Sequence, residues 1–218
     1  MIGAVIAMQS EADILLEQMK VERSLTVSGK NIHVGMAFGK EIAVCVCGVG
    51  KVNAALGAQL LISKFDVKKL VNFGVAGGLN QGTELCTVYQ ISHAVQFDFD
   101  LAELNGTQIG TLNEYETPYL ALNVSTCPYP LKKLGTADRF NDSAADYALL
   151  TKELEADIRD MEGAAIVQAA YAAQLPVFSL KAISDVAGSG STTEQFLKNK
   201  AAALVNLQAA LPLFFEEL

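Results

Sequence analysis

Short apolar runs separated by segments of helical periodicity are the feature that most restricts the fold of this chain. Three of these runs contain almost no polar residue: 2–7 (IGAVIA), 70–74 (LVNFG) and 177–183 (VFSLKAI). Continuous hydrophobicity of this kind is typical of strands in a sheet covered on both faces, whereas strands exposed on one face alternate apolar and polar residues. The sequence therefore predicts an α/β fold with a largely buried sheet.

Further elements are expected between these runs. The pattern predicts a hairpin of strands 31–37 and 41–47 with Gly39-Lys40 in the turn, and strands at 87–95 and 133–138. Helical spacing predicts helices at 10–20, 51–64, 147–157, 163–173 and 192–214. Residues 97–131 are weakly periodic, and we interpret them as an excursion that meets a partner subunit or a substrate. No linker interrupts the 218 residues, so we expect one domain, 1–218.

Charge and cysteine content argue against several classes of function. The chain has 16 Lys plus Arg against 24 Asp plus Glu, a net charge of -8, without the clustered cations that nucleic acid requires. We see neither a signal peptide nor a membrane span, and expect a cytoplasmic protein. With 4 Cys and 2 His, a zinc site is not expected, and Cys45, Cys47, Cys86 and Cys127 are interpreted as buried free thiols.

Three acidic residues stand at positions where a ligand would bind. Glu11 follows the first strand, Asp185 follows the 177–183 run, and Glu162 precedes a helix of small residues. Ligands of open α/β sheets bind beyond the carboxyl ends of strands. Taken singly, however, each acid is equally well explained as a helix or turn capping residue. The segment 48–51 (GVGK) lacks the spacing of a phosphate loop, and no G-x-S-x-G motif is present.

Seven stretches, taken in order, carry a family resemblance that covers nearly the whole chain. They are 6–11 (IAMQSE), 48–55 (GVGKVNAA), 72–78 (NFGVAGG), 136–140 (TADRF), 160–165 (DMEGAA), 181–186 (KAISDV) and 194–197 (EQFL). In this order they resemble the purine and uridine phosphorylase superfamily, most of all its methylthioadenosine/S-adenosylhomocysteine nucleosidases. The resemblance implies a three-layer α/β/α fold around a mixed, partly barrelled sheet, usually in a homodimer. It also implies hydrolysis of the N-glycosidic bond of an adenine nucleoside with a 5′-thioether, without metal or organic cofactor.

The resemblance also implies roles for individual residues. Asp185 would be the general acid at the purine N7, supported by Ser184, and Glu11 would activate the attacking water. Met161 and Glu162 would hold the ribose, while Phe140 would stack on the purine and the backbone of Asn141 would contact the purine edge. The remaining pocket residues would be Met8, Val49, Ala76, Gly77 and Lys181.

These residue types suit the chemistry. Adenine leaves readily only when protonated, so an acid is needed on the purine side, and burial of Asp185 would help it to hold a proton. Carboxylates such as Glu11 and Glu162 stabilise the positive charge that grows on the sugar in the transition state.

Two departures from the family pattern concern Val75, where bacterial nucleosidases often have Ser, and Lys181, where an Arg is common. The loop 188–193 also lacks an aromatic residue often found over the 5′ group. The 5′ preference therefore stays open between methylthioadenosine and S-adenosylhomocysteine, and acceptance of methylthio without homocysteinyl is one of the alternatives.

Three alternatives stay open at this stage. A phosphorylase would need Arg in the turns at 8–13 and 72–78, and neither turn contains one. A nucleosidase for futalosine or another adenosine derivative would use the same chemistry. A nucleoside-binding sensor without activity would not need Glu11, Glu162 and Asp185 together.

Overall fold

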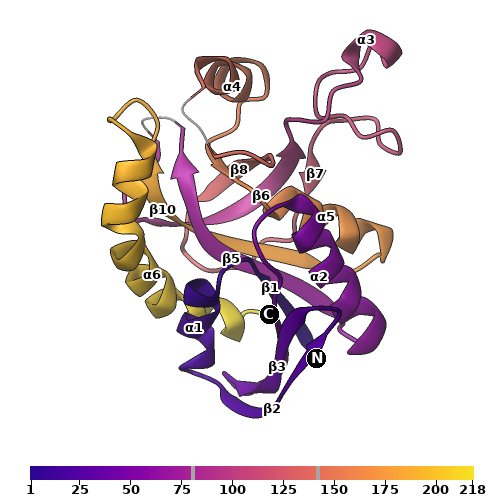
Figure 1. Ribbon diagram of the computed structural model, residues 1–218, viewed down its shortest axis with the longest axis vertical. Helices are drawn as coiled ribbons and strands as arrows, with labels where there is room; N and C mark the ends of the chain where they lie inside the picture. Colours follow the sequence, from indigo (N-terminus) through magenta and orange to yellow (C-terminus); the bar gives the residue numbers. More distant parts are fainter. Residues whose placement is uncertain (80–81, 141–142) are drawn as a thin grey trace.

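The computed structural model describes residues 1–79, 82–140 and 143–218. Their strands join in one mixed sheet with the order β10-β6-β8-β9-β5-β1-β4-β3-β2, and β7 pairs with β6 at its side (Figure 1). The strands are β1 (Ile2–Ile6), β2 (Lys20–Val27), β3 (Lys30–Ala37), β4 (Lys40–Val46), β5 (Lys69–Gly78), β6 (Val88–Gln96), β7 (Leu120–Ala121), β8 (Leu131–Thr136), β9 (Ile158–Asp160) and β10 (Val177–Val186).

Part of the sheet closes into a barrel. Strand β5 pairs in parallel with β1 at its start, with β10 along its whole length, and antiparallel with β9 at its end. Because β10 also pairs with β6, the strands β10, β6, β8, β9 and β5 form a closed ring. This confirms the partly barrelled mixed sheet. It also brings the carboxyl ends of β1, β5 and β10 to one side of the molecule.

Helices cover both faces of the sheet (Figure 1). On one face lie α2 (Lys51–Lys64) and α5 (Gly163–Ala172), which pack on each other, and on the other α1 (Gln9–Leu16) and α6 (Thr192–Glu216). Each pair buries its own apolar cluster against the sheet, with Leu61 and Ile166 in one and Leu15 and Phe214 in the other. The three-layer α/β/α prediction is thus confirmed, and the continuous apolar runs are explained by burial on both faces.

The remaining elements are short. They are α3 (Ala102–Asn105), α4 (Ala144–Ala148) and the π-helical turn η1 (Leu149–Glu153). In Figure 1, α3 projects from the body of the molecule within the 97–131 excursion, and α4 lies above the barrel.

Several predicted boundaries were wrong. The predicted helix 10–20 ends early because β2, a strand of mostly exposed residues, begins at Lys20. The predicted helix 147–157 is instead α4 and η1, and the chain then enters β9. The hairpin turn consists of Phe38-Gly39, both with positive φ as in a two-residue hairpin turn, so Lys40 already belongs to β4.

Two further observations concern the cysteines and the helices. Cys45, Cys47 and Cys127 are buried free thiols, whereas Cys86 is only partly buried, contrary to prediction. Among the described residues, no helix is both long and apolar enough to cross a membrane.

Candidate active site

A cavity of about 370 Å³ opens where β1, β5, β9 and β10 end. We call it the main cavity. It is lined by Ala7, Met8, Glu11, Val49, Val75, Ala76, Gly77, Phe140, Arg159, Asp160, Met161, Glu162, Ser184, Asp185, Thr193, Phe196 and Leu197. The walls are mainly apolar, and the three predicted carboxylates face the same space.

The structure brings together most of the predicted site residues. Ten of them line the main cavity: Met8, Glu11, Val49, Ala76, Gly77, Phe140, Met161, Glu162, Ser184 and Asp185. Lys181 is not among the lining residues, and it is buried behind the carboxylates. Asn141 lies outside the described residues.

Glu11 is held in the first turn of α1 by two backbone N–H groups. Val75 N donates to Oε1 at 2.8 Å, and Met8 N donates to Oε2 at 3.1 Å. Only 3% of Glu11 is exposed. Burial raises the pKa of Glu11, although Lys181, these two hydrogen bonds and Lys200 act in the opposite direction. A carboxylate held in this way, with a raised pKa, suits a general base.

Gly74 makes room for this carboxylate. A Cβ at Gly74 would lie 2.4 Å from Oε1 of Glu11, far closer than any real contact. Gly74 pairs with Lys181 across β5 and β10 in the interior of the sheet, where the backbone cannot retreat. The glycine in the 72–78 stretch is therefore required by close approach rather than by its backbone angles.

Asp185 lies at the end of β10, immediately after a break in register with β5 between Ile183 and Asp185. It is 1% exposed, and Ser184 Oγ donates to its Oδ2 at 2.9 Å. A Cβ at Gly77 would lie 2.8 Å from Asp185 Oδ1 and 3.2 Å from Arg159 Nε. Both side chains thus pack on the same face of the Gly77 backbone, in a place that only glycine leaves open.

Glu162 lies at the N-terminus of α5 and reaches across to α2. Its Oε1 accepts a hydrogen bond from Gly50 N at 2.8 Å. Burial, followed by the charge of Asp160, raises the pKa of Glu162 to about 7, with Lys181 and the Gly50 hydrogen bond opposing the shift. Glu162 therefore changes charge near neutral pH.

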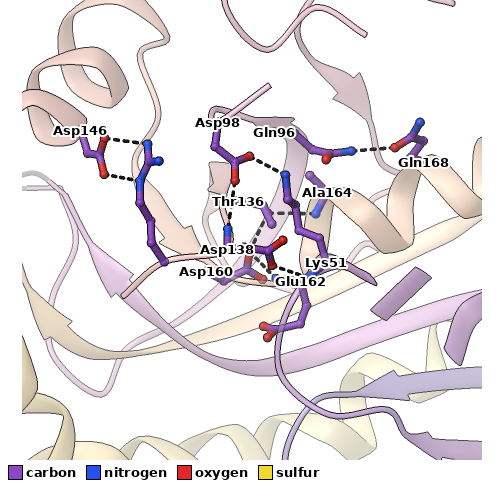
Figure 2. A network of polar contacts seen from close by, with 11 residues as sticks. Lys51, Gln96, Asp98, Thr136, Asp138, Asp146, Asp160, Glu162, Ala164 and Gln168 are labelled. Atoms are coloured by element: carbon purple, nitrogen blue, oxygen red, sulfur yellow. Dashed lines mark hydrogen bonds and ion pairs between the residues drawn. The ribbon is translucent and has the colours of Figure 1, made fainter. Parts of the chain in front are cut away.

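Lys181 is the buried counter-ion of this cluster. Its Nζ lies 2.8 Å from Asp160 Oδ2, and both side chains are almost fully enclosed. Burial alone would lower the pKa of Lys181, but Asp160, Glu162 and Glu11 outweigh burial and raise it. Asp160 is further fixed by Thr136, whose Oγ1 donates to Oδ1 at 2.6 Å (Figure 2). The N–H of Gly163 also donates to Asp160.

The Glu162 side of the cavity is also braced from the N-terminus of α2. Lys51 N donates to Asp138 Oδ1 at 2.7 Å, and Lys51 Nζ forms an ion pair with Asp98 at 2.5 Å. Asp98 in turn accepts from Asp138 N at 3.1 Å (Figure 2). These contacts fix the Val49-Gly50 segment, and with it the Gly50 N–H that donates a hydrogen bond to Glu162.

Sequence reasoning missed several lining residues, and the reasons differ. Phe196 and Leu197 come from the first turns of α6, and the sequence indicates them only as part of the 194–197 stretch (EQFL). Phe196 meets Phe140 edge-on with ring centroids 5.7 Å apart. Arg159 and Asp160 lie on β9, a strand of three residues that is too short to show a pattern, although Asp160 begins the recognised stretch 160–165 and Arg159 directly precedes it.

The arrangement can perform acid–base chemistry on a flat, largely apolar molecule. One end has a buried acid, Asp185, beside the exposed ring of Phe140. Two further carboxylates, Glu11 and Glu162, line the same cavity, and burial raises the pKa of both. Among the described residues, no group of three His, Cys, Asp or Glu side chains is placed to hold a metal ion.

Comparisons with known proteins identify the family and the relatives of this chain. The family model of the phosphorylase superfamily matches residues 1–215. A 5′-methylthioadenosine/S-adenosylhomocysteine nucleosidase of Listeria innocua is 30% identical over 212 residues, which cover 88% of each chain. Among solved structures, the nucleosidase of Colwellia psychrerythraea in complex with adenine is 27% identical, with TM-score 0.89, covering 99% of this chain and 95% of that one. A futalosine hydrolase of Helicobacter pylori, 24% identical with TM-score 0.90 and coverage of 100% and 97%, shares the fold.

Proposed function

The chain belongs to the phosphorylase superfamily and, within it, to the 5′-methylthioadenosine/S-adenosylhomocysteine nucleosidases, and we propose that it hydrolyses the N-glycosidic bond of such adenine nucleosides. The products are adenine and the 5-thio-ribose. The observation that carries the proposal is the convergence of Glu11, Glu162 and Asp185, each buried, on one mainly apolar cavity.

In the proposed mechanism Asp185 donates a proton to N7 of the purine, which makes adenine a good leaving group. Ser184 orients the Asp185 carboxyl group through its 2.9 Å hydrogen bond. Phe140 stacks on the base, and the backbone of Ala76 and Gly77 borders it.

As the bond to the base breaks, positive charge grows on the sugar. Glu162 accepts hydrogen bonds from the ribose hydroxyls, with Met161 against the ring, and its negative charge stabilises the oxocarbenium-like transition state more than the ground state. Glu11 takes a proton from the water that attacks the anomeric carbon on the face opposite the base, as in an inverting glycosidase.

The charges in the cavity favour water over phosphate as the nucleophile. A phosphorylase must bind a dianion beside the sugar, but Glu11 and Glu162 stand there with Asp160 close by. The cation next to them, Lys181, is already paired with Asp160. Arg139 is held by two hydrogen bonds to Asp146, at 2.6 and 2.8 Å. Arg159 lies against Gly77 and Asp185, on the side we assign to the base.

The direct test is a product assay with methylthioadenosine, run with and without phosphate. We expect free adenine and free thio-ribose at the same rate in both. Strict dependence on phosphate, with formation of a ribose 1-phosphate, would contradict hydrolysis. Parallel assays with S-adenosylhomocysteine, futalosine and 5′-deoxyadenosine would identify the substrate, since all present N7 to Asp185.

The 5′ substituent should be small and apolar. Met8, Phe196 and Leu197 give the cavity apolar walls, and the Phe196 ring packs edge-on against Phe140 there. This supports methylthioadenosine as the preferred substrate over S-adenosylhomocysteine, a preference that would serve methionine salvage. The relative kcat/KM of the two nucleosides tests it.

We further propose a cytoplasmic homodimer. The N-terminal half of α2 exposes Val52 (70%) and Leu56 (56%) one turn apart, in line with Val49 at the cavity. An exposed apolar ridge of this kind is typical of a protein interface. The projecting 97–131 excursion, with the exposed Leu104 of α3, would contribute to the same contact. Sedimentation at micromolar concentration tests the dimer.

A further inference from the structure

Lys200 stands behind the wall of the main cavity. It belongs to α6, two turns after the helix begins, and is only partly exposed. Its Nζ lies 3.7 Å from Met8 Sδ and 5.6 Å from the centre of the Phe196 ring. Both of these neighbours line the main cavity. The stem and the charge of Lys200 are therefore packed against the site, unlike those of a lysine extended into solvent.

Met8 connects this ammonium group to Glu11. The backbone N–H of Met8 donates to Glu11 Oε2, while the Met8 side chain touches Lys200. The charge of Lys200 acts on the Glu11 carboxylate and lowers its pKa, against the larger effect of burial. Lys200 therefore approaches Glu11 from α6, whereas Lys181 approaches it from β10.

The charges around Glu11 show why a second cation matters. The charged groups that act on it are Lys181, Lys200 and Glu162, with Asp160 behind Lys181. Strand β1, which packs under α1, has no charged residue, and those of β4 and β5 (Lys40, Glu41, Lys69) lie at the opposite ends of their strands from the cavity. Because Lys181 is shared with Asp160 and Glu162, it neutralises Glu11 only in part.

We propose that Lys200 is a positioning residue for the proposed hydrolysis, and that its ammonium group, held between Met8 and Phe196, keeps Glu11 charged as the base for the attacking water. The inference rests on the proposed function. Lys200 does not contact the substrate in this proposal. The charge of Lys200 acts on Glu11 through the electric field at the Glu11 carboxylate, and its side chain acts through the position of Met8.

The experiment is the pH profile of kcat/KM for adenine release by Lys200→Met, Lys200→Arg and the control Lys198→Met. Lys198 is an exposed residue of the same helix. At about pH 6, Lys200→Met should lower kcat/KM roughly three- to tenfold, and at about pH 8.5 it should leave it within about twofold, because more of Glu11 is protonated at the lower pH. Lys200→Arg, which keeps the charge, and Lys198→Met should follow the wild-type profile.

Salt gives a second readout. Because Lys200 is partly exposed, molar salt should reduce the difference between Lys200→Met and wild type at about pH 6. Thermal melts establish that each variant is folded, and Lys200→Gln replaces Lys200→Met, with the same expectation, if the latter does not fold.

The outcomes separate the two proposals. An unchanged profile, or a loss of equal size at every pH, would overturn the role of Lys200 while leaving the nucleosidase assignment in place. A wild-type protein that releases no base from any nucleoside at any pH would instead overturn the proposed function itself.

Discussion

Substitution of Gly74 by alanine should displace the carboxylate of the proposed catalytic base, Glu11, while Glu11 itself is not substituted. The added Cβ would lie 2.4 Å from Glu11 Oε1 and 2.9 Å from its Cδ, so the carboxylate must move by about 1 Å to reach an ordinary contact distance. This movement would break the 2.8 Å hydrogen bond from Val75 N. A misplacement of about 1 Å in a catalytic group costs on the order of 10²-fold in rate, or about 2.7 kcal/mol in the transition state.

The assay is steady-state release of adenine from methylthioadenosine by Gly74→Ala, with a thermal melt on the same sample. We expect kcat/KM to fall about 10²-fold, and the overpacked interior to lower stability by roughly 1–3 kcal/mol. A double-mutant cycle with Glu11→Ala separates the displacement of the Glu11 carboxylate from the general overpacking of the interior, because a Cβ at residue 74 fits once the Glu11 carboxylate is gone. In that background Gly74→Ala should change the residual activity less than about threefold. Full activity of folded Gly74→Ala would refute the placement of Glu11.

Two other perturbations have clear expected outcomes. Because Glu162 has a raised pKa of about 7, kcat/KM should fall as the pH drops below about 7, whereas thermal stability should rise from about pH 8 to pH 6, since the folded state then binds a proton that the unfolded glutamate, with its lower pKa, does not bind. Parallel pH series of kinetics and thermal melting would show these opposite slopes. A stability that falls toward pH 6 would contradict the environment described for Glu162. Lys181→Met should leave Asp160 buried without its 2.8 Å partner and lower the free energy of unfolding, measured in urea at about pH 8, by roughly 3–5 kcal/mol. The control Lys68→Met, which breaks the exposed pair with Asp66, should leave the free energy of unfolding unchanged. Equal effects of the two substitutions would argue against Lys181 as a buried counter-ion.

Much of the fold could be predicted because the sheet is buried on both faces. The runs at 2–7, 70–74 and 177–183 are β1, β5 and β10, and helix α2 begins and ends at the predicted residues, after Gly50 and at Lys64. Strand β2 was missed because most of its residues are exposed, which left it without the apolar alternation that marks a strand. Strand β9 has only three residues, too few for any periodicity, yet it closes the barrel between β5 and β8.

The site was predicted as a set of residues but not as a set of contacts. The order of the stretches identified Glu11, Glu162 and Asp185, and the structure places all three on one cavity. The contacts that hold these residues are formed between positions far apart in the sequence. Lys181 forms an ion pair with Asp160, and the backbone N–H of Gly50 donates a hydrogen bond to Glu162. Lys200 lies 192 positions from Met8, so no local pattern could indicate their contact.

In the proposed mechanism, Asp185 gives the departing purine its proton. The most direct measurement is single-turnover release of adenine from methylthioadenosine by Asp185→Asn, with the affinity for the nucleoside measured calorimetrically on the same protein. Asn keeps the shape of Asp185 but cannot donate a carboxylic proton, so we expect a loss of adenine release of at least about 10²-fold with affinity for the nucleoside nearly unchanged. Adenine release at the wild-type rate by the folded variant would contradict it.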